Sequence, residues 1–219
     1  MSGLGLVLLG PPGAGKGTQA AWLCRDLGLI HISTGDLLRR HRAERTRLGL
    51  EAAGYIAAGR LVPDEIVTAM LLDAIPGDPA QGFVLDGFPR TTAQADALAD
   101  ALSDRGRDVT AALLIAAPDE AIVDRICGRL TCPRGHVFHL RTSPPAVAGR
   151  CDQDGEPLGR RPDDTPETLR RRLAVYHSET EPLVGYYERL GLLHRFDGTL
   201  APEAVAAAIR ARVATAART

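Results

Sequence analysis

The chain opens with a hydrophobic run that ends at a glycine. Residues 4–9 read Leu-Gly-Leu-Val-Leu-Leu, and the glycine-rich segment 10–15 follows them. A short run without polar positions is typical of a strand that is buried on both faces of a parallel sheet. Residues 16–27 then carry apolar positions at helical spacing. The pattern therefore predicts a strand, a glycine loop and a helix, in that order.

Two more short hydrophobic runs repeat this rhythm. Residues 83–85 and 111–115 are apolar throughout, and a stretch with helical spacing follows each of them. Alternating strands and helices favour a parallel sheet that is covered by helices on both faces. The alanine-rich segment 202–217, with arginines interspersed, predicts a last helix on the surface.

Two segments do not follow the alternation. Residues 33–62 are basic and helical in pattern, with no strand of their own. Residues 128–164 are rich in Gly, Pro, Arg and Cys and contain short β-like pieces separated by turns. We interpret both as insertions into one α/β core domain, which consists of residues 1–32, 63–127 and 165–219.

The glycine loop has the residue types of a phosphate-binding site. Glycines let the backbone curl so that successive N–H groups point at phosphate oxygens, and the following helix adds the positive end of its dipole. Lys16 is placed to reach the β- and γ-phosphates, and Thr18 to approach a phosphate or the shell of Mg²⁺. The loop predicts a site for a nucleoside triphosphate, formed by Gly13, Ala14, Gly15, Lys16, Gly17 and Thr18.

An aspartate stands where such sites hold a metal ion. Asp86 directly follows the apolar run 83–85, and in phosphate-loop enzymes a carboxylate at this place holds Mg²⁺ or its waters. A helix cap or a turn is the structural alternative for this residue. The sequence contains no Asn-Lys-x-Asp signature of guanine recognition, which disfavours a GTPase and leaves ATPases and several kinases open.

Further blocks of sequence follow in order along nearly the whole chain. The general phosphate-loop pattern has Ser or Thr directly after the lysine, whereas Gly17 intervenes here, a variant found in nucleoside monophosphate kinases. The block Asp-Gly-Phe-Pro-Arg-Thr at 86–91 is especially specific to them. The remaining blocks are 33–39 (Ser-Thr-Gly-Asp-Leu-Leu-Arg), 59–62 (Gly-Arg-Leu-Val), 124–129 and 161–172. With these blocks in this order, the sequence resembles the adenylate kinase family, in its bacterial form with a long lid.

The resemblance implies a P-loop NTPase fold and a reaction. Residues 33–62 would form a helical lobe that binds the nucleoside monophosphate, and residues 128–164 a small β-rich lid. The reaction would be reversible transfer of the γ-phosphoryl group of Mg·ATP to AMP, which gives two ADP. The attacking phosphate oxygen is already ionised at neutral pH, so alignment and charge neutralisation would suffice without a general base.

The resemblance also implies which residues hold each nucleotide. Beyond the phosphate loop, the ATP site would include Arg125, Arg129, Val137, Phe138 and Leu200, with the ring of Phe138 near the adenine. The AMP site would consist of Thr34, Arg39, Arg60, Leu61, Val62, Gly87, Phe88, Pro89, Arg90, Gln94, Arg161 and Arg172. Within it, Gln94 offers one donor and one acceptor to the adenine edge.

A smaller group of cations would carry the catalysis. Arginine forks suit phosphate oxygens, and several converging cations stabilise the charge spread over a transferring phosphoryl group. Asp86 would hold Mg²⁺ through water. The implied catalytic residues are Lys16, Arg90, Arg125, Arg129, Arg161 and Arg172.

The lid raises the question of zinc. In some bacterial relatives, zinc in the lid is bound by a Cys-x-x-Cys pair and a later Cys-x-x-Cys or Cys-x-x-Asp pair. The later half is present here as Cys151 and Asp154, whereas Thr131 and Arg134 occupy the first pair. We therefore expect no structural zinc but a polar cluster around an Arg134–Asp154 ion pair. An irregular ligand set is the alternative, made of Cys132, His136, Cys151 and Asp154.

Composition indicates which partners and which compartment to expect for the protein. The 219 residues have a net charge of −1 and 4 % aromatic residues, which argues against a nucleic-acid partner and against attraction to an anionic membrane. The first hydrophobic run is too short to span a bilayer. Four cysteines do not form a dense disulfide framework, as expected in a reducing compartment. We expect a cytoplasmic protein that acts on ATP, AMP and ADP, with a monomer as the default.

Two alternatives stay open at this point. The acceptor can instead be GMP, UMP or CMP, or the donor GTP, although Gln94 together with Thr34 favours AMP. A non-catalytic nucleotide sensor is an alternative of a different class. Such a protein is expected to lose its phosphate-clamping residues, whereas the lysine and the arginines are all present.

Overall fold

The computed structural model describes residues 3–46, 49, 50, 52, 54, 55, 62–161 and 164–216. Arg60 and Leu61 of the predicted AMP site lie outside the described residues.

The core of the structure is a parallel sheet of five strands. Its order across the sheet is β2-β3-β1-β4-β7, and every neighbouring pair is parallel. The three hydrophobic runs of the sequence form β1, β3 and β4, as predicted. The strands are β1 (Gly5–Leu9), β2 (Ile30–Ser33), β3 (Phe83–Asp86), β4 (Ala111–Ala116) and β7 (Leu193–Asp197).

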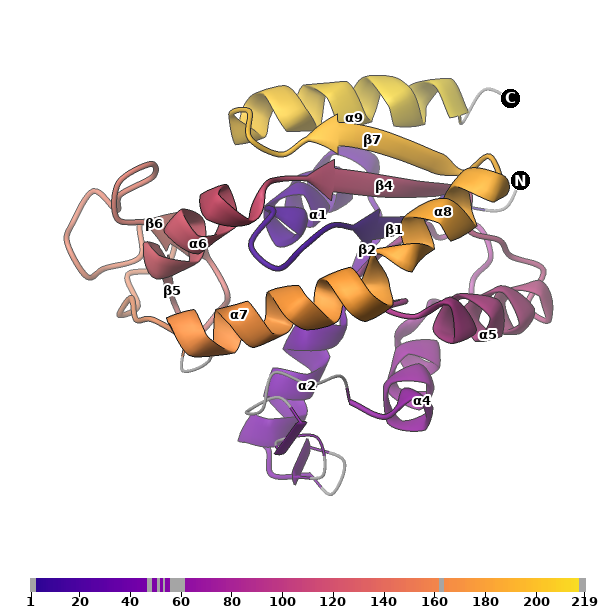
Figure 1. The fold of residues 1–219 in the computed structure, drawn as a ribbon, viewed down its shortest axis with the longest axis horizontal. Coiled ribbons are helices and arrows are strands. Elements are labelled where there is room, and N and C mark those ends of the chain that lie inside the picture. Colours follow the sequence, from indigo (N-terminus) through magenta and orange to yellow (C-terminus); the bar gives the residue numbers. More distant parts are fainter. Residues whose placement is uncertain are drawn as a thin grey trace.

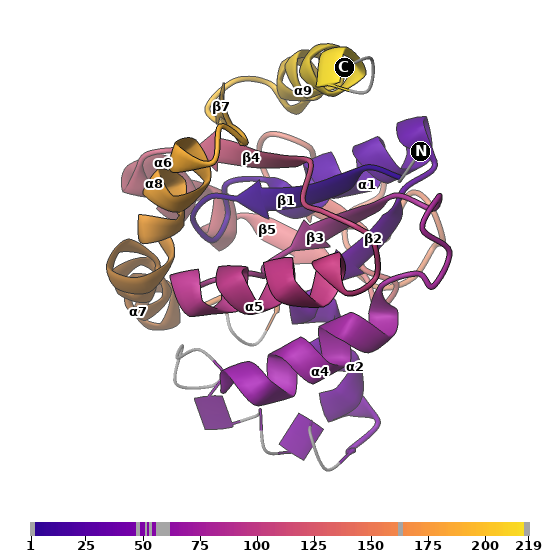
Figure 2. The same ribbon diagram turned by 90° about the vertical axis from the view of Figure 1, so that its right-hand side faces the viewer.

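Helices cover both faces of this sheet, so the predicted α/β architecture is confirmed. Alternate residues of β1 point to opposite faces: Leu6 and Leu8 belong to one hydrophobic cluster, Val7 and Leu9 to the other. The first cluster is covered by α1 (Lys16–Leu27) and α9 (Pro202–Ala216), the second by α4 (Asp64–Ala74), α5 (Thr92–Ser103) and α8 (Pro182–Arg189). Figures 1 and 2 show the two layers from perpendicular directions.

Strand register brings three loops to one edge of the sheet. Leu8 of β1 pairs with Asp86 of β3, and Ser33 of β2 pairs with the same Asp86. The glycine loop after β1, the start of α2 (Thr34–Ala43) and the turn after β3 therefore meet at the carboxyl ends of their strands. Ligands of open parallel sheets bind at this edge.

The second predicted insertion contains a small antiparallel hairpin. Between α6 (Asp119–Cys127) and α7 (Pro166–Val175), β5 (Arg129–Thr131) pairs with β6 (Val137–His139), at the left of Figure 1. Single bridges such as Thr131 to Gly159 extend the pairing. A five-residue π-helix, η1 (Tyr176–Thr180), joins α7 to α8. The β-like pieces predicted for this segment are thus present, while the exact domain boundaries stay a prediction.

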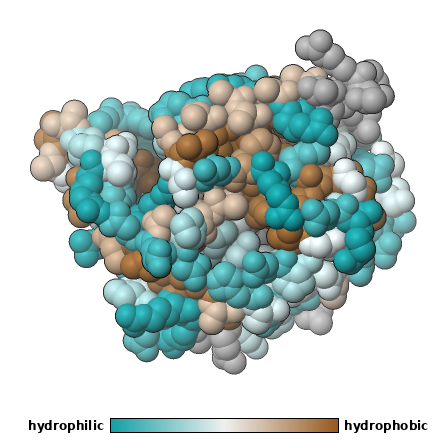
Figure 3. All heavy atoms as spheres, turned by 45° about the horizontal axis from the view of Figure 1, so that its top comes forward, coloured by the Kyte–Doolittle hydropathy of each residue, from teal (hydrophilic) through white to brown (hydrophobic). Residues whose placement is uncertain are grey.

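The described helices and the exposed apolar side chains show how the surface of the structure is composed. None of these helices has the length and apolar character needed to cross a bilayer. On the face drawn in Figure 3, hydrophobic atoms lie in patches among hydrophilic ones. Some large apolar side chains are exposed, such as Leu190 at 55 % and Leu200 at 52 %, which is ordinary for a folded domain.

The sheet core predicts a clear difference between two leucines. Leu113 of β4 is 0 % exposed and Leu190, after α8, is 55 % exposed. We expect Leu113→Ala to lower the free energy of unfolding by about 2–5 kcal/mol, because it leaves a cavity in a packed core. Leu190→Ala should change it by less than about 0.5 kcal/mol. Urea unfolding followed by circular dichroism checks this, and equal losses would contradict the assigned core.

Candidate active site

The glycine loop after β1 is held in a shape that only glycine permits. Gly10 has φ +135°, and a Cβ there would stand 2.3 Å from the carbonyl oxygen of Ile115 in β4. At Gly13, with φ +84°, a Cβ would press on Ile126 of α6 at 2.8 Å. Helix α1 then begins at Lys16 behind Gly15, whose backbone is left-handed and which offers no side-chain cap. The N–H groups at this helix end are therefore available to an anion.

Lys16, the single lysine of the sequence, lies across this loop. Its Nζ donates hydrogen bonds to the carbonyl oxygens of Gly10 at 2.7 Å and Pro11 at 2.9 Å. Burial, with a smaller contribution from nearby arginines, lowers the pKa of Lys16 to about 8, although Asp86 acts in the opposite direction. The charged ammonium form is therefore less favoured here than in water.

Five arginines share these surroundings with Lys16. Burial and the charge of Arg172 lower the pKa of Arg90 to about 10, although Asp86 opposes them. Burial and the charges of Arg129 and Arg39 lower the pKa of Arg161, also to about 10. Like charges held this close repel one another unless an anion lies between them. We call this group the cation cluster: Lys16, Arg39, Arg90, Arg129, Arg161 and Arg172.

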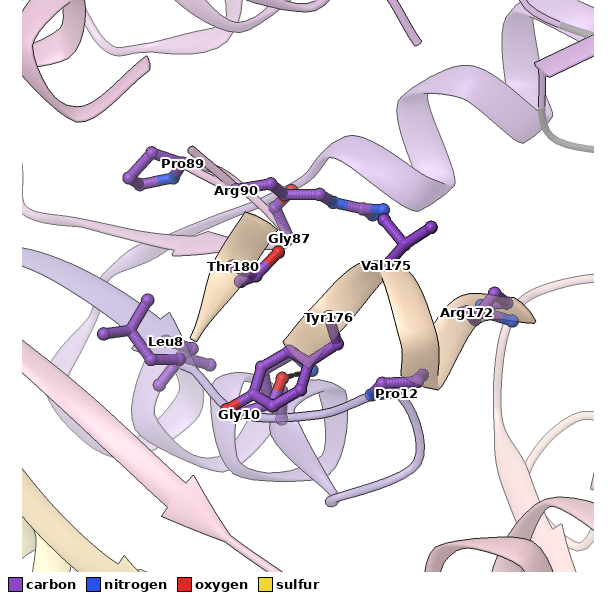
Figure 4. Close-up of a pocket in the computed structure, with 12 residues that line it drawn as sticks. Leu8, Gly10, Pro12, Gly87, Pro89, Arg90, Arg172, Val175, Tyr176 and Thr180 are labelled. Carbon is purple, nitrogen blue, oxygen red and sulfur yellow. Dashed lines mark hydrogen bonds between the residues drawn. The ribbon is translucent and has the colours of Figure 1, made fainter. Parts of the chain in front are cut away.

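A cavity of about 80 Å³ opens beside the cation cluster. It lies between the glycine loop, the turn after β3, and the end of α7 with η1. Figure 4 shows Arg90 extending from that turn toward α7, which carries Arg172 and Val175, with Pro12 and Tyr176 below. The cavity therefore lies where the loop after β1 and the turn after β3 face each other.

Asp86 supplies the negative charge at the sheet edge. Its side chain is 14 % exposed, and a Cβ on Gly17 would stand 3.4 Å from its Oδ2. Burial alone would raise the pKa of Asp86, but His31 and Lys16 outweigh it and lower the pKa. An ionised carboxylate beside the phosphate loop and Thr18 fits a Mg²⁺ ion bound through water.

His31 was missed in the sequence analysis. Its Nε2 is buried 3.7 Å from Asp86 Oδ2, without a hydrogen-bond partner among the described residues. The only sequence signal for it is its place in β2, two residues before Ser33, which pairs with Asp86.

The turn after β3 and the start of α2 form one bonded unit on the predicted acceptor side. The Thr34 hydroxyl donates to the carbonyl oxygen of Gly87 at 2.9 Å, and Arg90 Nε donates to the same oxygen at 2.8 Å. Gly87 has φ +87°, and a Cβ there would stand 2.7 Å from Thr34 Oγ1. Gln94 accepts the Arg90 backbone N–H at 2.7 Å. Thr34, Gly87, Arg90 and Gln94 are thus brought together.

The other predicted acceptor residues support this unit or flank it. Phe88 and Pro89 are buried beneath the turn, and Val62 is buried in the cluster that holds α2 and α4. Arg39 forms an ion pair with Asp36 one helical turn before it. In the described part of the acceptor site, buried side chains therefore support the turn after β3, and the Arg39 side chain is held by Asp36.

Arg125 and Arg129, the two arginines predicted to contact ATP from the lid, have different surroundings. Arg129 donates two hydrogen bonds to the fully buried Asp164, one from Nε to Oδ2 at 2.8 Å and one from Nη2 to Oδ1. Arg125 is not part of the cation cluster as described; its charge acts on Asp197, at the end of β7. Asp163, next to Asp164, lies outside the described residues.

The residues predicted around the ATP adenine have unequal exposure. Phe138 is 7 % exposed inside a small lid core with Cys132 and Cys151, whereas its neighbour Val137 is 49 % exposed. Leu200 is 52 % exposed, and its turn is tied to β4 because the N–H of Gly198 donates to Ala116 at 2.7 Å. Stacking of Phe138 on the base stays a prediction, and the structure gives this ring a packing role in the lid.

The lid also gathers four metal-ligand side chains. His136 Nδ1 lies 3.0 Å from Asp154 Oδ2, 3.3 Å from Cys132 Sγ and 3.4 Å from Cys151 Sγ. All four ligand atoms lie within 4.8 Å of one another. The predicted Arg134–Asp154 pair is present at 3.9 Å, but Arg134 is 69 % exposed and stands at the rim. The expectation that this pair forms the centre is wrong, because the hairpin turns His136 inward.

Comparison with known proteins identifies the family of this site. A family model described as adenylate kinase matches residues 8–192. The chain belongs to the adenylate kinase family. Among curated adenylate kinases, that of Clostridium beijerinckii is 49 % identical over 198 residues, which cover 90 % of this chain and 92 % of the relative. The adenylate kinase of Moorella thermoacetica is 48 % identical over 206 residues, 93 % of this chain and 95 % of the relative.

A third adenylate kinase, from Streptomyces avermitilis, is 49 % identical over 191 residues, with 86 % of this chain and 87 % of the relative covered. The family match spans the glycine loop, the acceptor turn and the lid. The chain is therefore an adenylate kinase-type phosphotransferase, and its nucleotide substrates follow from the family.

The single lysine makes its titration directly measurable. We expect the acetylation rate of Lys16 to reach half its maximum near pH 8 in the free adenylate kinase, and ATP to raise that midpoint toward its usual value of about 10.4. Burial and arginine charges disfavour the ammonium form, and phosphate favours it. Mass spectrometry of the Lys16 peptide gives the rate at each pH. Asp86→Asn is the control and should lower the midpoint further; a midpoint at the usual value without ATP would contradict the described surroundings.

Proposed function

We propose that this chain transfers the γ-phosphoryl group of Mg·ATP to AMP at the edge of the sheet and releases two ADP. The observation that carries the proposal is the cation cluster, in which burial and neighbouring arginines lower the pKa values of Lys16, Arg90 and Arg161. Phosphate groups of two nucleotides would supply the missing negative charge. The family match supports the same reaction.

On the donor side, the glycine loop from Gly13 to Thr18 would hold the ATP phosphates with its N–H groups and Lys16. Asp86 and Thr18 would hold Mg²⁺, which supplies charge neutralisation on the phosphates when bound. Arg125 and Arg129 would contact ATP from the lid, and Val137, Phe138 and Leu200 would surround its adenine.

On the acceptor side, Arg39 and Arg90 would grip the AMP phosphate. Gln94 would read the adenine edge, next to Thr34, Val62 and the backbone of Gly87. Arg60 and Leu61 complete the prediction from the sequence. Arg161 and Arg172 would bridge the two phosphate groups, since their guanidinium forks suit two oxygens at once.

The chemistry then needs little beyond alignment. An ionised oxygen of the AMP phosphate attacks the γ-phosphorus, the bond from that phosphorus to the β,γ-bridging oxygen breaks, and ADP leaves with the bond electrons. No proton moves in this step. Lys16, Arg90, Arg161 and Arg172 hold the reacting oxygens in line and stabilise the charge of the transition state. We further propose a monomer in the cytoplasm that takes only small nucleotides as partners.

Arg90 gives the most direct test of the acceptor site. We expect Arg90→Ala to lower kcat/KM for AMP by about 10²–10³-fold, because one charge-assisted contact to the transferring group is lost. Binding of ATP should persist. The measurement is ADP formation from Mg·ATP with AMP, GMP, UMP or CMP in turn.

The matched control is Arg170→Ala on the exposed face of α7, which should leave the rate within about twofold. Preference for another monophosphate would overturn AMP as the acceptor. A folded chain that binds ATP but uses no acceptor would favour the sensor alternative.

We infer, as a second role, that the lid cluster binds a zinc ion. The spacing argument against zinc no longer applies, since four side chains of the types that zinc prefers converge although their sequence spacing is irregular. Cys132 and Cys151 are buried, and the Asp154 side chain is 3 % exposed. The inferred ligands are Cys132, His136, Cys151 and Asp154.

Metal content tests this inference. Elemental mass spectrometry of the purified full chain should find close to one zinc per chain. Cys151→Ser should lower that content and the melting temperature, because a structural ion stabilises the fold that holds it. Cys127→Ser, at an exposed thiol outside the cluster, is the control and should keep both. A metal-free chain whose melting temperature does not respond to added zinc would contradict the zinc site and favour a hydrogen-bonded polar cluster.

A further inference from the structure

The side-chain amide of Gln94 is fixed from two directions. Gln94 is 3 % exposed, in the first turn of α5. Its Nε2 donates to Asp64 Oδ1 at 2.5 Å, and its Oε1 accepts the backbone N–H of Arg90 at 2.7 Å. Its own N–H is bonded to the Thr91 hydroxyl at 3.2 Å. Backbone and side chain of Gln94 are therefore both held.

These two partners permit only one orientation of the amide. A carboxylate such as Asp64 only accepts hydrogen bonds, and a backbone N–H only donates them. A flipped amide would set its oxygen against the Asp64 carboxylate and its NH₂ group against the Arg90 N–H. Both contacts would be repulsive. The hydrogen-bonding character of the two partners therefore fixes which end of the Gln94 amide is nitrogen.

Asp64 reaches Gln94 from a different element. It is the first residue of α4, while Gln94 lies 30 residues later in α5. The two helices are joined beneath this contact by the hydrophobic cluster that contains Leu71 and Leu98, both at most 1 % exposed. The position of the Asp64 carboxylate is therefore set by helix packing and not by a local turn.

A fixed amide can pair with only one kind of purine edge. An amide has two N–H donors and two acceptor positions, so one of each is left after the bonds to Asp64 and Arg90. Adenine presents an acceptor at N1 and a donor at N6, whereas hypoxanthine and guanine present a donor at N1 and an acceptor at O6. The amide must flip to pair with the second pattern, and Asp64 opposes that flip.

We propose that Asp64 is a specificity-determining residue, which makes Gln94 select adenine over 6-oxopurines in the acceptor nucleotide. The inference rests on the proposed function, in which Gln94 faces the base of AMP. Asp64 acts through Gln94 and is a positioning residue, since it does not itself touch the base in this proposal.

AMP and IMP are the matched pair of probes, because their bases differ only at N1 and the 6-position. We measure kcat/KM for each with Mg·ATP in the unchanged chain, Asp64→Ala and Asp64→Asn. The unchanged chain should favour AMP by at least about 100-fold, since the wrong pattern leaves buried polar groups unpaired. Asp64→Ala should reduce the AMP/IMP ratio by about 10-fold or more, chiefly through the KM values.

Asp64→Asn is the variant of nearly the same shape. Its side-chain amide can donate as well as accept hydrogen bonds, so it no longer opposes the flip of Gln94, and the ratio should fall about as much as in Asp64→Ala. The ratio compares two substrates in one sample, so an unfolded fraction lowers both rates alike and leaves the ratio unaffected.

The outcomes separate this inference from the proposed function. A lower ratio in both Asp64→Ala and Asp64→Asn supports it. An unchanged ratio in either variant overturns the Asp64 carboxylate as the group that orients the amide. A lack of any AMP phosphorylation by the unchanged chain would instead overturn the proposed function itself.

Discussion

Repulsion among partly buried cations at one edge of the sheet is the constraint around which this structure is arranged. Lys16, Arg90 and Arg161 all have lowered pKa values, with burial as the largest cause and neighbouring arginines as a further one. Asp86 offsets part of this charge. A fold does not keep such an arrangement for stability, since buried like charges oppose folding. It becomes favourable when phosphate groups occupy the edge, which is why the cluster points to phosphoryl transfer.

The cations hold internal partners that a nucleotide phosphate can replace. Lys16 donates to the carbonyl oxygens of its own loop, Arg129 to Asp164, and Arg39 pairs with Asp36. Each partner keeps a charged group hydrogen-bonded and in place near the edge. The parallel sheet then sets the distance between donor and acceptor sides, because the loop after β1 and the turn after β3 start from paired residues. Preorganisation of this kind is the main source of electrostatic catalysis.

Much of this architecture follows from local sequence. The apolar runs at 4–9, 83–85 and 111–115 predict the central strands, because short uninterrupted hydrophobic segments are typical of strands buried on both faces of a parallel sheet. The glycine loop predicts its own shape, since Gly10 and Gly13 lie where a Cβ would collide with β4 and α6. The grouping of Thr34, Gly87, Arg90 and Gln94 was predicted from the resemblance to the family, and in the structure it depends on the pairing of β2 with β3.

The remaining features depend on contacts between distant elements. His136 enters the lid cluster because the β5–β6 hairpin turns it inward, and ligand spacing in the sequence does not reveal that turn. Phe138 is buried in the lid, although its position in the motif suggested a ring facing a nucleotide. Asp64 reaches Gln94 across 30 residues through the packing of α4 against α5. Such pairs arise from tertiary packing, which no local pattern of residues encodes.

The fate of one phosphoryl group tests the central claim most directly. ATP labelled with radioactive phosphorus at the γ position is incubated with AMP, Mg²⁺ and the intact chain, and the products are separated by chromatography. The account predicts that the label appears in ADP, with one labelled ADP formed for each AMP consumed, while inorganic phosphate stays unlabelled. Label in inorganic phosphate with AMP unchanged would contradict it, because the cation cluster would then serve hydrolysis and not transfer between two nucleotides.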